Sequence, residues 1–438
     1  MPTTITSDNL HLIQNSQFRK YAQIYLDIYE NFMEQINQKG LALASYDERK
    51  PEDISPVLPF QGLISRNGSK SFYTKWSSPA CEACKKGVGS VTFFISLKCH
   101  RHCYFCFNSN QENHEYFSNH QRDCVAELEK MYKSGQKLAY IALTGGEPLL
   151  YKKETIDFFE FTRKKFPRTH TRLYTSGDLL DQSTLQELKE AGLNEIRFSI
   201  KMEDPPDTRR KVYEKIEFAK QYIKDVMVEM PVIPGTETEM KELLLILDQL
   251  GISGINLLEF CYPFHNAKEF QKRGFQIKNP PYHTLYNYWY AGGLPVAQSE
   301  EICFRLLEFT LEKELKMGVH YCSLENKHTG QVFQQNNSQS QPIMYFSPAD
   351  YFLKSAKVFG DDIPKVLKIF KKKDISLYRI NNQYNFLEFH VKDISQLKGL
   401  DIEVAISSNI MEDRPGGKIL RELKTELVKP EKFSLKLI

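Results

Sequence analysis

The stretch Cys99-His-Arg-His-Cys103-Tyr-Phe-Cys106 decides the fold and the chemistry of this chain. Thiolate is the soft ligand that iron–sulfur clusters require. Three cysteines separated by three and then two residues let a single loop hold three corners of a 4Fe–4S cube. No cysteine at a further short spacing serves the fourth iron, so that iron keeps an open position where a substrate or cosubstrate can bind.

A second motif, Thr144-Gly145-Gly146-Glu147-Pro148, follows about one βα unit downstream, and Phe105 precedes the last cysteine of the loop. Together these residues resemble the radical S-adenosylmethionine (SAM) superfamily. A zinc knuckle is the alternative for the cysteines, but zinc sites bring a fourth Cys or His at a second short spacing. His100 and His102 lie between the cysteines, where a closed tetrahedral site would be cramped.

The resemblance implies a mechanism and a set of contacts. SAM chelates the open iron, an electron cleaves its sulfur–carbon bond, and the 5′-deoxyadenosyl radical removes hydrogen from an unactivated carbon. The motif at Thr144, Gly145, Gly146 and Glu147, with Phe105, is implied to hold the methionine end of SAM. A simple turn before a proline is the alternative for the glycines.

Three polar residues at the ends of later strands point into the same space. Similar positions in the superfamily bind the methionyl carboxylate and the ribose, so the resemblance implies these roles for Ser176, Ser199 and Lys201. The sequence alone leaves ordinary strand-end polar residues as an equal alternative.

The bulk composition predicts an ordinary globular enzyme. The chain has 438 residues, 41% of them hydrophobic and 26% charged, with a net charge of +3 that indicates no nucleic-acid partner. No apolar leader or membrane-length apolar run is present. Nine cysteines at metal-like spacings without a secretion signal favour a reducing cytoplasm.

The chain is expected to contain two or three domains. Residues 91–260 alternate strand and helix, which predicts a parallel sheet with right-handed crossovers. With six βα repeats, the fold class is α/β, a partial (βα)₆ barrel open on one side. The expected strands are 91–96, 138–143, 171–176, 195–200, 226–233 and 254–260, and the expected helices include 124–134, 153–166, 183–191 and 237–250.

Further segments flank the barrel. Residues 1–90 are expected to form an N-terminal extension with a helix over 15–38, and residues 261–330 a post-barrel segment. Residues 331–342 are polar and of low complexity, which predicts a linker. Residues 343–438 are expected to form a small α+β domain with a hairpin around Asn381-Asn382. The lysines of 365–373 are expected on a solvated helix face.

Three further stretches narrow the resemblance. They are Pro79-Ala-Cys81-Glu-Ala-Cys84, Cys106-Phe-Asn108-Ser-Asn110 leading to Tyr116, and His320-Tyr321-Cys322-Ser-Leu-Glu325-Asn326-Lys327-His328. This combination resembles the methanogenesis-marker family of cobalamin-dependent radical SAM methyltransferases, which methylate an arginine carbon in methyl-coenzyme M reductase. It implies cobalamin as a cofactor, carried by the C-terminal module of residues 343–438, although the chain has no Asp-x-His-x-x-Gly motif. A substrate-docking or dimerising module is the alternative for these residues. It also implies that Tyr116 is a ligand to the open iron when SAM is absent. The alternative is that Tyr116 is an ordinary aromatic residue that anchors a long loop.

Cys81 and Cys84 form a Cys-x-x-Cys knuckle that needs two more ligands to close a tetrahedral iron or zinc site. Cys303 and Cys322 are the expected partners, since both follow the barrel and can fold back over the knuckle. Cys124 and Cys261 are expected to be core residues.

Three functions compete at this point. The first is C-methylation of a protein or peptide side chain, which requires an external electron donor such as flavodoxin or ferredoxin. The second is a radical SAM enzyme that modifies a ribosomal peptide without cobalamin. Such enzymes usually carry a cysteine-rich C-terminal extension, and the last hundred residues here contain no cysteine. The third, a non-catalytic iron–sulfur scaffold, fits poorly with an intact Gly-Gly-Glu-Pro motif.

Overall fold

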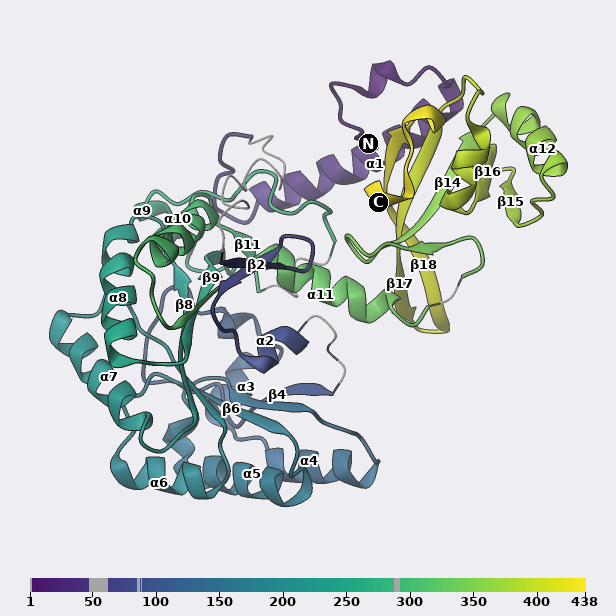
Figure 1. Ribbon diagram of the computed structural model, residues 1–438. Coiled ribbons are helices and arrows are strands. Elements are labelled where there is room, and N and C mark those ends of the chain that lie inside the picture. Colours follow the sequence, from purple (N-terminus) through teal and green to yellow (C-terminus); the bar gives the residue numbers. More distant parts are fainter. Residues whose placement is uncertain (1, 47–61, 85–86, 88, 287–291, 340) are drawn as a thin grey trace. The chain divides into compact units, whose positions relative to one another are not determined.

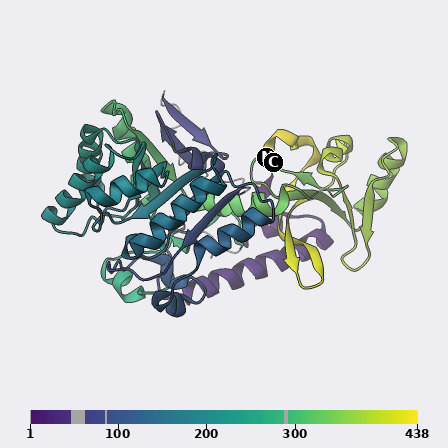
Figure 2. The same cartoon turned by 90° about the horizontal axis from the view of Figure 1, so that it is seen from below.

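The computed structural model describes residues 2–46, 62–84, 87, 89–286, 292–339 and 341–438. The chain divides into two compact units (Figures 1 and 2). The barrel unit comprises Gly40–Pro281 and Tyr288–His328, and the C-terminal unit comprises Met1–Lys39, Tyr282–Asn287 and Thr329–Ile438. The expected extension over residues 1–90 is therefore not a single unit, because its first helix belongs with the C-terminal residues.

The barrel unit is built on a nine-stranded sheet, of which seven neighbouring strands run parallel. Six of these are the strands expected from the sequence, so the partial barrel is confirmed. Their order is β4 (Ser90–Phe94), β5 (Tyr140–Thr144), β6 (His170–Thr175), β7 (Glu195–Phe198), β8 (Asp225–Val232) and β9 (Gly254–Glu259).

A seventh parallel strand, β12 (Gly318–Cys322), pairs with β9 and was not expected. The antiparallel strands β3 (Ser71–Thr74) and β2 (Leu63–Arg66) extend the sheet beyond it. Strands β2 and β4 end the order in the described part of the chain, so the sheet stays open. A small pair, β10 (Cys261–Tyr262) and β11 (Leu294–Pro295), lies outside this sheet.

Amphipathic helices bury their apolar sides against the outer face of the sheet. Ile196 and Phe198 of β7 belong to this core, whereas Glu195 and Arg197 point to the opposite, inner face, because side chains alternate along a strand. The larger helices are α4 (Cys124–Lys133), α5 (Lys152–Lys165), α6 (Gln182–Glu190), α7 (Pro206–Ala219), α8 (Glu237–Leu250) and α10 (Ser299–Glu312). The shorter ones are α2 (Pro79–Ala83), α3 (His114–Asn119) and α9 (Ala267–Lys272).

The C-terminal unit is an antiparallel sheet flanked by helices, in agreement with the α+β expectation. The hairpin around Asn381-Asn382 is confirmed, since β15 and β16 pair antiparallel. The strands run in the order β1 (Thr3–Thr4), β18 (Gly417–Val428), β17 (Val404–Arg414), β14 (Leu353–Phe359), β16 (Phe386–Phe389) and β15 (Tyr378–Asn381), and β13 (Tyr345–Phe346) pairs with β14. Helix α12 (Asp362–Lys372) buries Val366 and Phe370 and exposes its lysines as expected.

Helix α1 (Ser16–Asn37) belongs to this sheet rather than to the barrel unit. Its Asn15 cap accepts hydrogen bonds from the backbone of Gln17 and Phe18. Phe18 stacks on Phe359 of β14 with ring centroids 5.0 Å apart. The Tyr21 hydroxyl donates to Glu422 at 2.9 Å. This docking joins residues almost four hundred positions apart, which no local pattern can indicate.

The expected linker over 331–342 is wrong for its first half, because helix α11 (Leu324–Asn336) occupies it. Val332 and Asn336 are buried. The Asn336 amide donates to the Tyr351 carbonyl at 2.9 Å and accepts from the Met411 backbone at 2.9 Å. A polar composition therefore hid a helix whose Asn336 is buried and hydrogen-bonded at both ends of its amide. No helix of the described chain combines the length and apolar character needed to cross a bilayer.

Candidate active site

The cysteine loop leaves the sheet at the carboxyl end of β4, where α/β folds place their sites. Cys99, Cys103 and Cys106 are all partly exposed. Burial and the negative charges of Cys106 and Cys99 raise the pKa of Cys103 to about 11. The Lys201 ammonium lowers this pKa and so offsets part of the rise. These mutual effects mean that the three thiols and Lys201 lie within electrostatic reach of one another.

Arg101 lies between the ligand cysteines and ties their loop to the rest of the barrel rim. Its guanidinium binds both carboxylate oxygens of Asp178 at 2.6 Å and also contacts Asp204. His100 approaches the same Asp178 at 2.6 Å. Because Asp178 follows β6 and Asp204 follows β7, Arg101 joins the loops after three strands, and its bidentate geometry fixes their spacing.

The two glycines after β5 let the backbone of this turn touch the cysteine loop. A Cβ on Gly146 would lie 1.8 Å from the Lys98 carbonyl oxygen, and Gly145 has a φ of +113° with a Cβ position 2.5 Å from that of Phe94. Backbone N–H groups of Gly146 and Glu147 donate to the carbonyls of Ser96 and Lys98 at 3.1 and 2.9 Å. No larger residue fits at either position without displacing the loop.

Glu147 is buried and connects the end of β5 to the end of β6. Its carboxylate accepts from the Thr175 hydroxyl at 2.7 Å and from the Ser176 backbone and hydroxyl at 2.8 and 2.7 Å. It also accepts from the Leu149 backbone at 3.2 Å. Every lone pair of this carboxylate is therefore used to shape the turn.

Aromatic side chains hold the far end of the cysteine loop. The Phe105 ring meets Phe260, just after β9, edge-on at 5.8 Å and Tyr104 at 5.1 Å. Tyr104 in turn packs on Phe270 of α9 at 5.3 Å, under the guanidinium of Arg273 at 4.0 Å. Phe105 is thus a packing anchor of the loop.

The donor set of this loop fits a cluster better than a single ion. Within the described residues, no three His, Cys, Asp or Glu side chains stand close enough to hold one metal ion. A cluster spaces its thiolates more widely, because each one binds a different iron. Three thiols on one loop, with a glycine turn against them, match that larger group.

The model of the Radical SAM superfamily matches residues 93–247, which include the cysteine loop and the glycine turn. This stretch is a radical SAM domain. Membership implies a 4Fe–4S cluster and SAM as cofactors. The sequence-based assignment to the superfamily is confirmed, whereas the narrower methanogenesis-marker resemblance stays a prediction.

Similar proteins differ in how much of the chain they share. A Methanocaldococcus jannaschii protein, provisionally named as an activating enzyme of a glycyl-radical enzyme, is 26% identical over 370 residues, covering 80% of this chain and 92% of that protein. Streptococcus suis SuiB bound to its precursor peptide SuiA is 13% identical, with a TM-score of 0.40 over 72% of this chain and 66% of that one. Native anSMEcpe with AdoMet and a peptide is 16% identical, with a TM-score of 0.37 over 60% and 72%. The match to SuiB bound to SAM covers 53% of the SuiB chain, so this chain spans about half of its length.

The radical SAM domain places the other expected SAM contacts around the same rim. Thr144 ends β5 and is partly exposed, as are Ser176 and Lys201, and Ser199 is exposed. Ser176 donates its hydroxyl to Glu147, so in this arrangement it supports the turn. Direct contacts of these four residues with SAM stay predictions.

Tyr116 lies on α3, in the chain segment that returns to the cysteine loop, where the Leu97 N–H donates to the Phe117 carbonyl at 2.9 Å. Its ring is 56% exposed and stacks on His120 with centroids 4.1 Å apart. A ligand role for its phenol oxygen stays a prediction from the resemblance.

We expect a Tyr116→Phe change to alter the visible and electron paramagnetic resonance spectra of the resting cluster, because only the oxygen is removed. Thermal stability should change little, since the ring and its stacking are kept. His120→Ala is the matched control, as it removes the stacking partner and keeps the oxygen. Spectra of Tyr116→Phe identical to those of the parent would make Tyr116 structural only.

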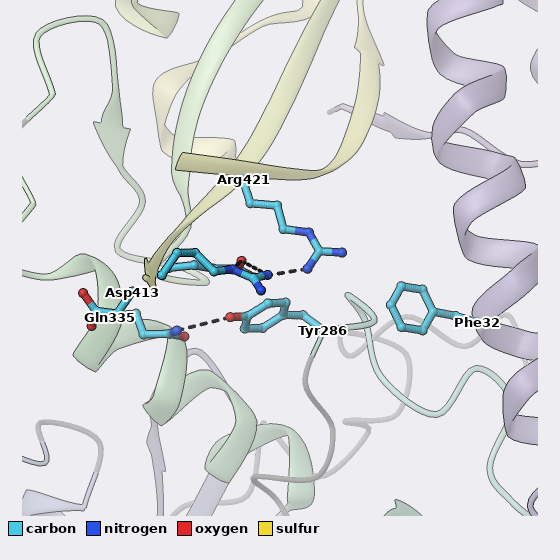
Figure 3. A pocket seen from close by; sticks show the side chains of 7 residues that line it. Phe32, Tyr286, Gln335, Asp413 and Arg421 are labelled. Carbon is cyan, nitrogen blue, oxygen red and sulfur yellow. Dashed lines mark hydrogen bonds and ion pairs between the residues drawn. The ribbon is translucent and has the colours of Figure 1, made fainter. Parts of the chain in front are cut away.

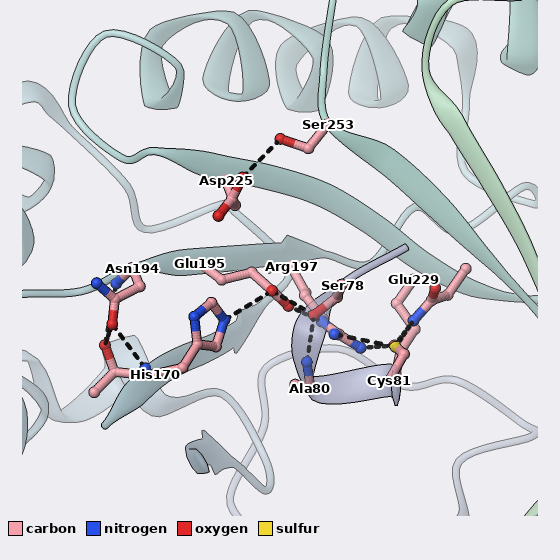
Figure 4. A network of polar contacts seen from close by, with 12 residues as sticks. Ser78, Ala80, Cys81, His170, Asn194, Glu195, Arg197, Asp225, Glu229 and Ser253 are labelled. Carbon is pink, nitrogen blue, oxygen red and sulfur yellow. Dashed lines mark hydrogen bonds and ion pairs between the residues drawn. The ribbon is translucent and has the colours of Figure 1, made fainter. Parts of the chain in front are cut away.

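A charged network fills the inner face of the sheet beneath the rim (Figure 4). Glu195 and Arg197 of β7 pair at 2.5 Å, and Arg197 also pairs with Glu229 of β8. Helix α2 closes the network, since the Ser78 hydroxyl donates to Glu195 at 2.6 Å and Cys81 accepts from Arg197 at 3.4 Å. Sequence reasoning missed this network, because its members come from two strands and a helix that only the fold brings together.

The structure brings Cys322 toward the Cys81 knuckle but not Cys303. On β12, His320 faces the inner network, where it hydrogen-bonds Asn256 at 2.9 Å, and Asn256 donates to Cys81 at 3.3 Å. Cys322 is two residues on and shares this face. Cys303 is fully buried in α10, in the core on the outer face of the sheet.

Cys261 is a residue that the sequence reasoning misplaced. It is partly exposed rather than buried, whereas Cys124 is a core residue as expected. Burial lowers the pKa of Lys327, but the negative charges of Cys322, Cys261, Glu229 and Cys84 outweigh this effect and raise it. Cys261 therefore lies within electrostatic reach of Lys327, as do Cys322 and Cys84.

Proposed function

We propose that this radical SAM enzyme removes a hydrogen atom from an unactivated carbon of a protein or peptide side chain, and that this carbon is then methylated. The observation that supports this best is the meeting of the cysteine loop, the glycine turn and Lys201 at the carboxyl edge of an open barrel. An open sheet leaves room for a polypeptide beside SAM. Arginine is the target that the sequence resemblance implies.

The chain's own residues have positioning roles in this reaction. When bound, the reduced cluster supplies the electron that cleaves SAM into methionine and the 5′-deoxyadenosyl radical. Arg101 holds the cysteine loop to the neighbouring rim loops, and Glu147 holds the glycine turn. Lys201 places a positive charge beside Cys103, which stabilises the thiolate form needed for ligation.

Cobalamin is the methyl carrier that the resemblance implies, and one pocket of the C-terminal unit tests its fit (Figure 3). The pocket has a volume of about 480 Å³ and contains no histidine. Pockets of this size hold drug-sized molecules, and a corrinoid is larger. Arg414 and Arg421 in its wall are both paired with Glu412. This pocket does not fit cobalamin, so no step of the mechanism is routed through it.

The experiment that tests the proposal combines corrinoid binding with product analysis. Cobalamin-dependent methylation requires a corrinoid site outside this pocket, so anaerobically reconstituted protein incubated with hydroxocobalamin should then keep stoichiometric corrinoid absorbance through gel filtration. With a polypeptide substrate, mass spectrometry should show a gain of one methyl group. If the corrinoid elutes free while SAM is still cleaved, cobalamin-independent modification of a ribosomal peptide becomes the better reading.

A second candidate function comes from the Methanocaldococcus jannaschii relative, whose name describes activation of a glycyl-radical enzyme. That reaction takes hydrogen from a backbone glycine instead of a side chain. It would leave a stable radical on the partner protein, with no methyl group added. Electron paramagnetic resonance of the partner separates this reaction from methylation.

We also propose that a second iron or zinc ion draws together Cys81, Cys84 and Cys322, with Cys261 in place of Cys303 as the fourth ligand. In the described part of the chain, no three of these thiols stand close enough without the ion to form a metal site. Support comes from the electrostatic effects of Cys81 and Cys84 on Cys322, and of Cys322, Cys261 and Cys84 on Lys327. Metal analysis of the Cys99/Cys103/Cys106 triple-alanine variant should still find about one tightly held metal ion. Cys303→Ala should keep this metal and Cys261→Ala should lose it, whereas a folded, metal-free triple variant would contradict the site.

Two expectations from the sequence complete the proposal. An external one-electron donor such as flavodoxin or ferredoxin would reduce the cluster. A reducing cytoplasm is the compartment that nine unpaired cysteines favour.

A further inference from the structure

Strand β15 ends the sheet of the C-terminal unit and pairs only with β16 on the described chain (Figure 1). Its outer side therefore presents unpaired backbone N–H and C=O groups, which can template another strand. Proteins usually blunt such edges by keeping them very short, or with proline, bulges or several charges; of these devices β15 uses only its short length. The four residues of β15 carry one charge, no proline and no register shift.

The edge also exposes apolar side chains that its own unit leaves uncovered. Leu377 is 44% exposed, Tyr378 38% and Ile380 51%. Tyr378 and Ile380 stand on the same face, and the Tyr378 ring touches Phe370 of α12 at 6.0 Å. The apolar residues packed between α12 and the sheet therefore extend to exposed apolar side chains at the edge strand β15.

Positive charge surrounds this apolar edge. Residues 361–385 carry six lysine or arginine side chains against three aspartates, a net charge of +3 that equals the charge of the whole chain. Lys368, Lys371, Lys372 and Lys373 are exposed, and none of these four has a carboxylate partner in the described structure. This patch therefore attracts anionic groups at long range.

We propose that β15 and the lysine face of α12 dock an extended acidic segment of the polypeptide substrate, which adds to the sheet as a further strand. This rests on the proposed function in requiring a polypeptide substrate. Backbone hydrogen bonds to β15 give affinity, alternate apolar side chains of the segment pack on Tyr378 and Ile380, and its carboxylates meet the lysines. A second copy of this chain is a less favourable partner for the β15 edge, because its docking would bring two patches of charge +3 together.

The test uses the full chain and a fluorescent synthetic peptide of alternating glutamate and valine. Fluorescence anisotropy should show salt-sensitive binding, and a peptide of alternating lysine and valine should not bind. Backbone N-methylation of alternate valines in the acidic peptide should abolish binding, because it blocks one row of hydrogen bonds. Equal binding of the methylated peptide would overturn strand addition.

Variants locate the surface. Ile380→Asp and the Lys371→Glu/Lys372→Glu pair should each weaken binding about tenfold or more. Ile419→Asp, at a 46% exposed isoleucine of β18, and the exposed pair Lys432→Glu/Lys436→Glu are matched controls that should bind as the parent does. Equal affinity in all variants would overturn the proposal, as would a single-stranded RNA that binds the parent more tightly and displaces the peptide.

Production of 5′-deoxyadenosine without peptide keeps the two proposals apart. It should be unchanged in Ile380→Asp, since β15 belongs to the other unit from the cysteine loop. A parent protein that cleaves SAM but does not bind the acidic peptide would overturn the docking surface alone. A docked peptide or protein that is never methylated would overturn the proposed function alone.

Discussion

Replacement of Cys99, Cys103 and Cys106 by alanine is expected to abolish the iron–sulfur absorbance of the reconstituted protein and all formation of 5′-deoxyadenosine. The three thiols are the donors of one loop and affect one another's ionisation. Without them the electron has no route to SAM. Anaerobic iron and sulfide analysis, visible spectroscopy and chromatography of the nucleoside products measure the effect.

The matched control is Cys124→Ala. Cys124 is buried on α4 and donates to the Phe94 carbonyl at 3.3 Å, away from the ligand loop. It should cost some stability and leave the cluster and SAM cleavage in place. Persistent 5′-deoxyadenosine formation by the triple variant would overturn the assignment of the cluster ligands.

Glu195→Gln is expected to destabilise the barrel unit by about 3 kcal/mol. Burial opposes ionisation of Glu195, but the charge of Arg197 and hydrogen bonds from His170 and Ser78 lower its pKa to about 2. The ordinary value is 4.5, and each unit of difference corresponds to about 1.4 kcal/mol. Urea denaturation followed by circular dichroism at neutral pH measures the loss.

The sign of the pH dependence follows from the lowered pKa. The unfolded chain binds the proton more tightly, so the stabilisation by Glu195 is fully present above pH 4.5 and is lost as the pH falls toward 2. The Gln variant should lack this component of acid denaturation. Glu187→Gln is the matched control, because its side chain is 41% exposed and pairs with Lys152 at the surface, where solvent screens the interaction. Equal destabilisation by both changes would contradict a structural role of the inner network.

Local patterns predicted the parts of the molecule that depend on neighbours in sequence. The cysteine loop and the glycine turn could be predicted because spacing alone places their backbone. The six βα repeats could be predicted because buried parallel strands alternate with amphipathic helices. Strand β12 was missed, because its buried His320 and terminal Cys322 suggested a ligand motif more than a strand.

Long-range packing explains the remaining errors. The structure places Cys303 away from the Cys81 knuckle, because α10 packs it into the core on the outer face of the sheet, and that packing depends on residues distant in sequence. Helix α11 was hidden by its glutamines and asparagines, of which Asn336 is paired inside the fold. The union of α1 with the C-terminal sheet rests on contacts such as Phe18 with Phe359, which sequence spacing does not encode.

The clamp formed by Arg101, Asp178 and Asp204 ties the ligand loop to two other rim loops that contribute no cysteine. A change at Asp178 or Asp204 would therefore alter the position of the three thiols relative to the barrel rim without removing a ligand. Residues outside the ligand set thus share control of the geometry in which the cluster is held.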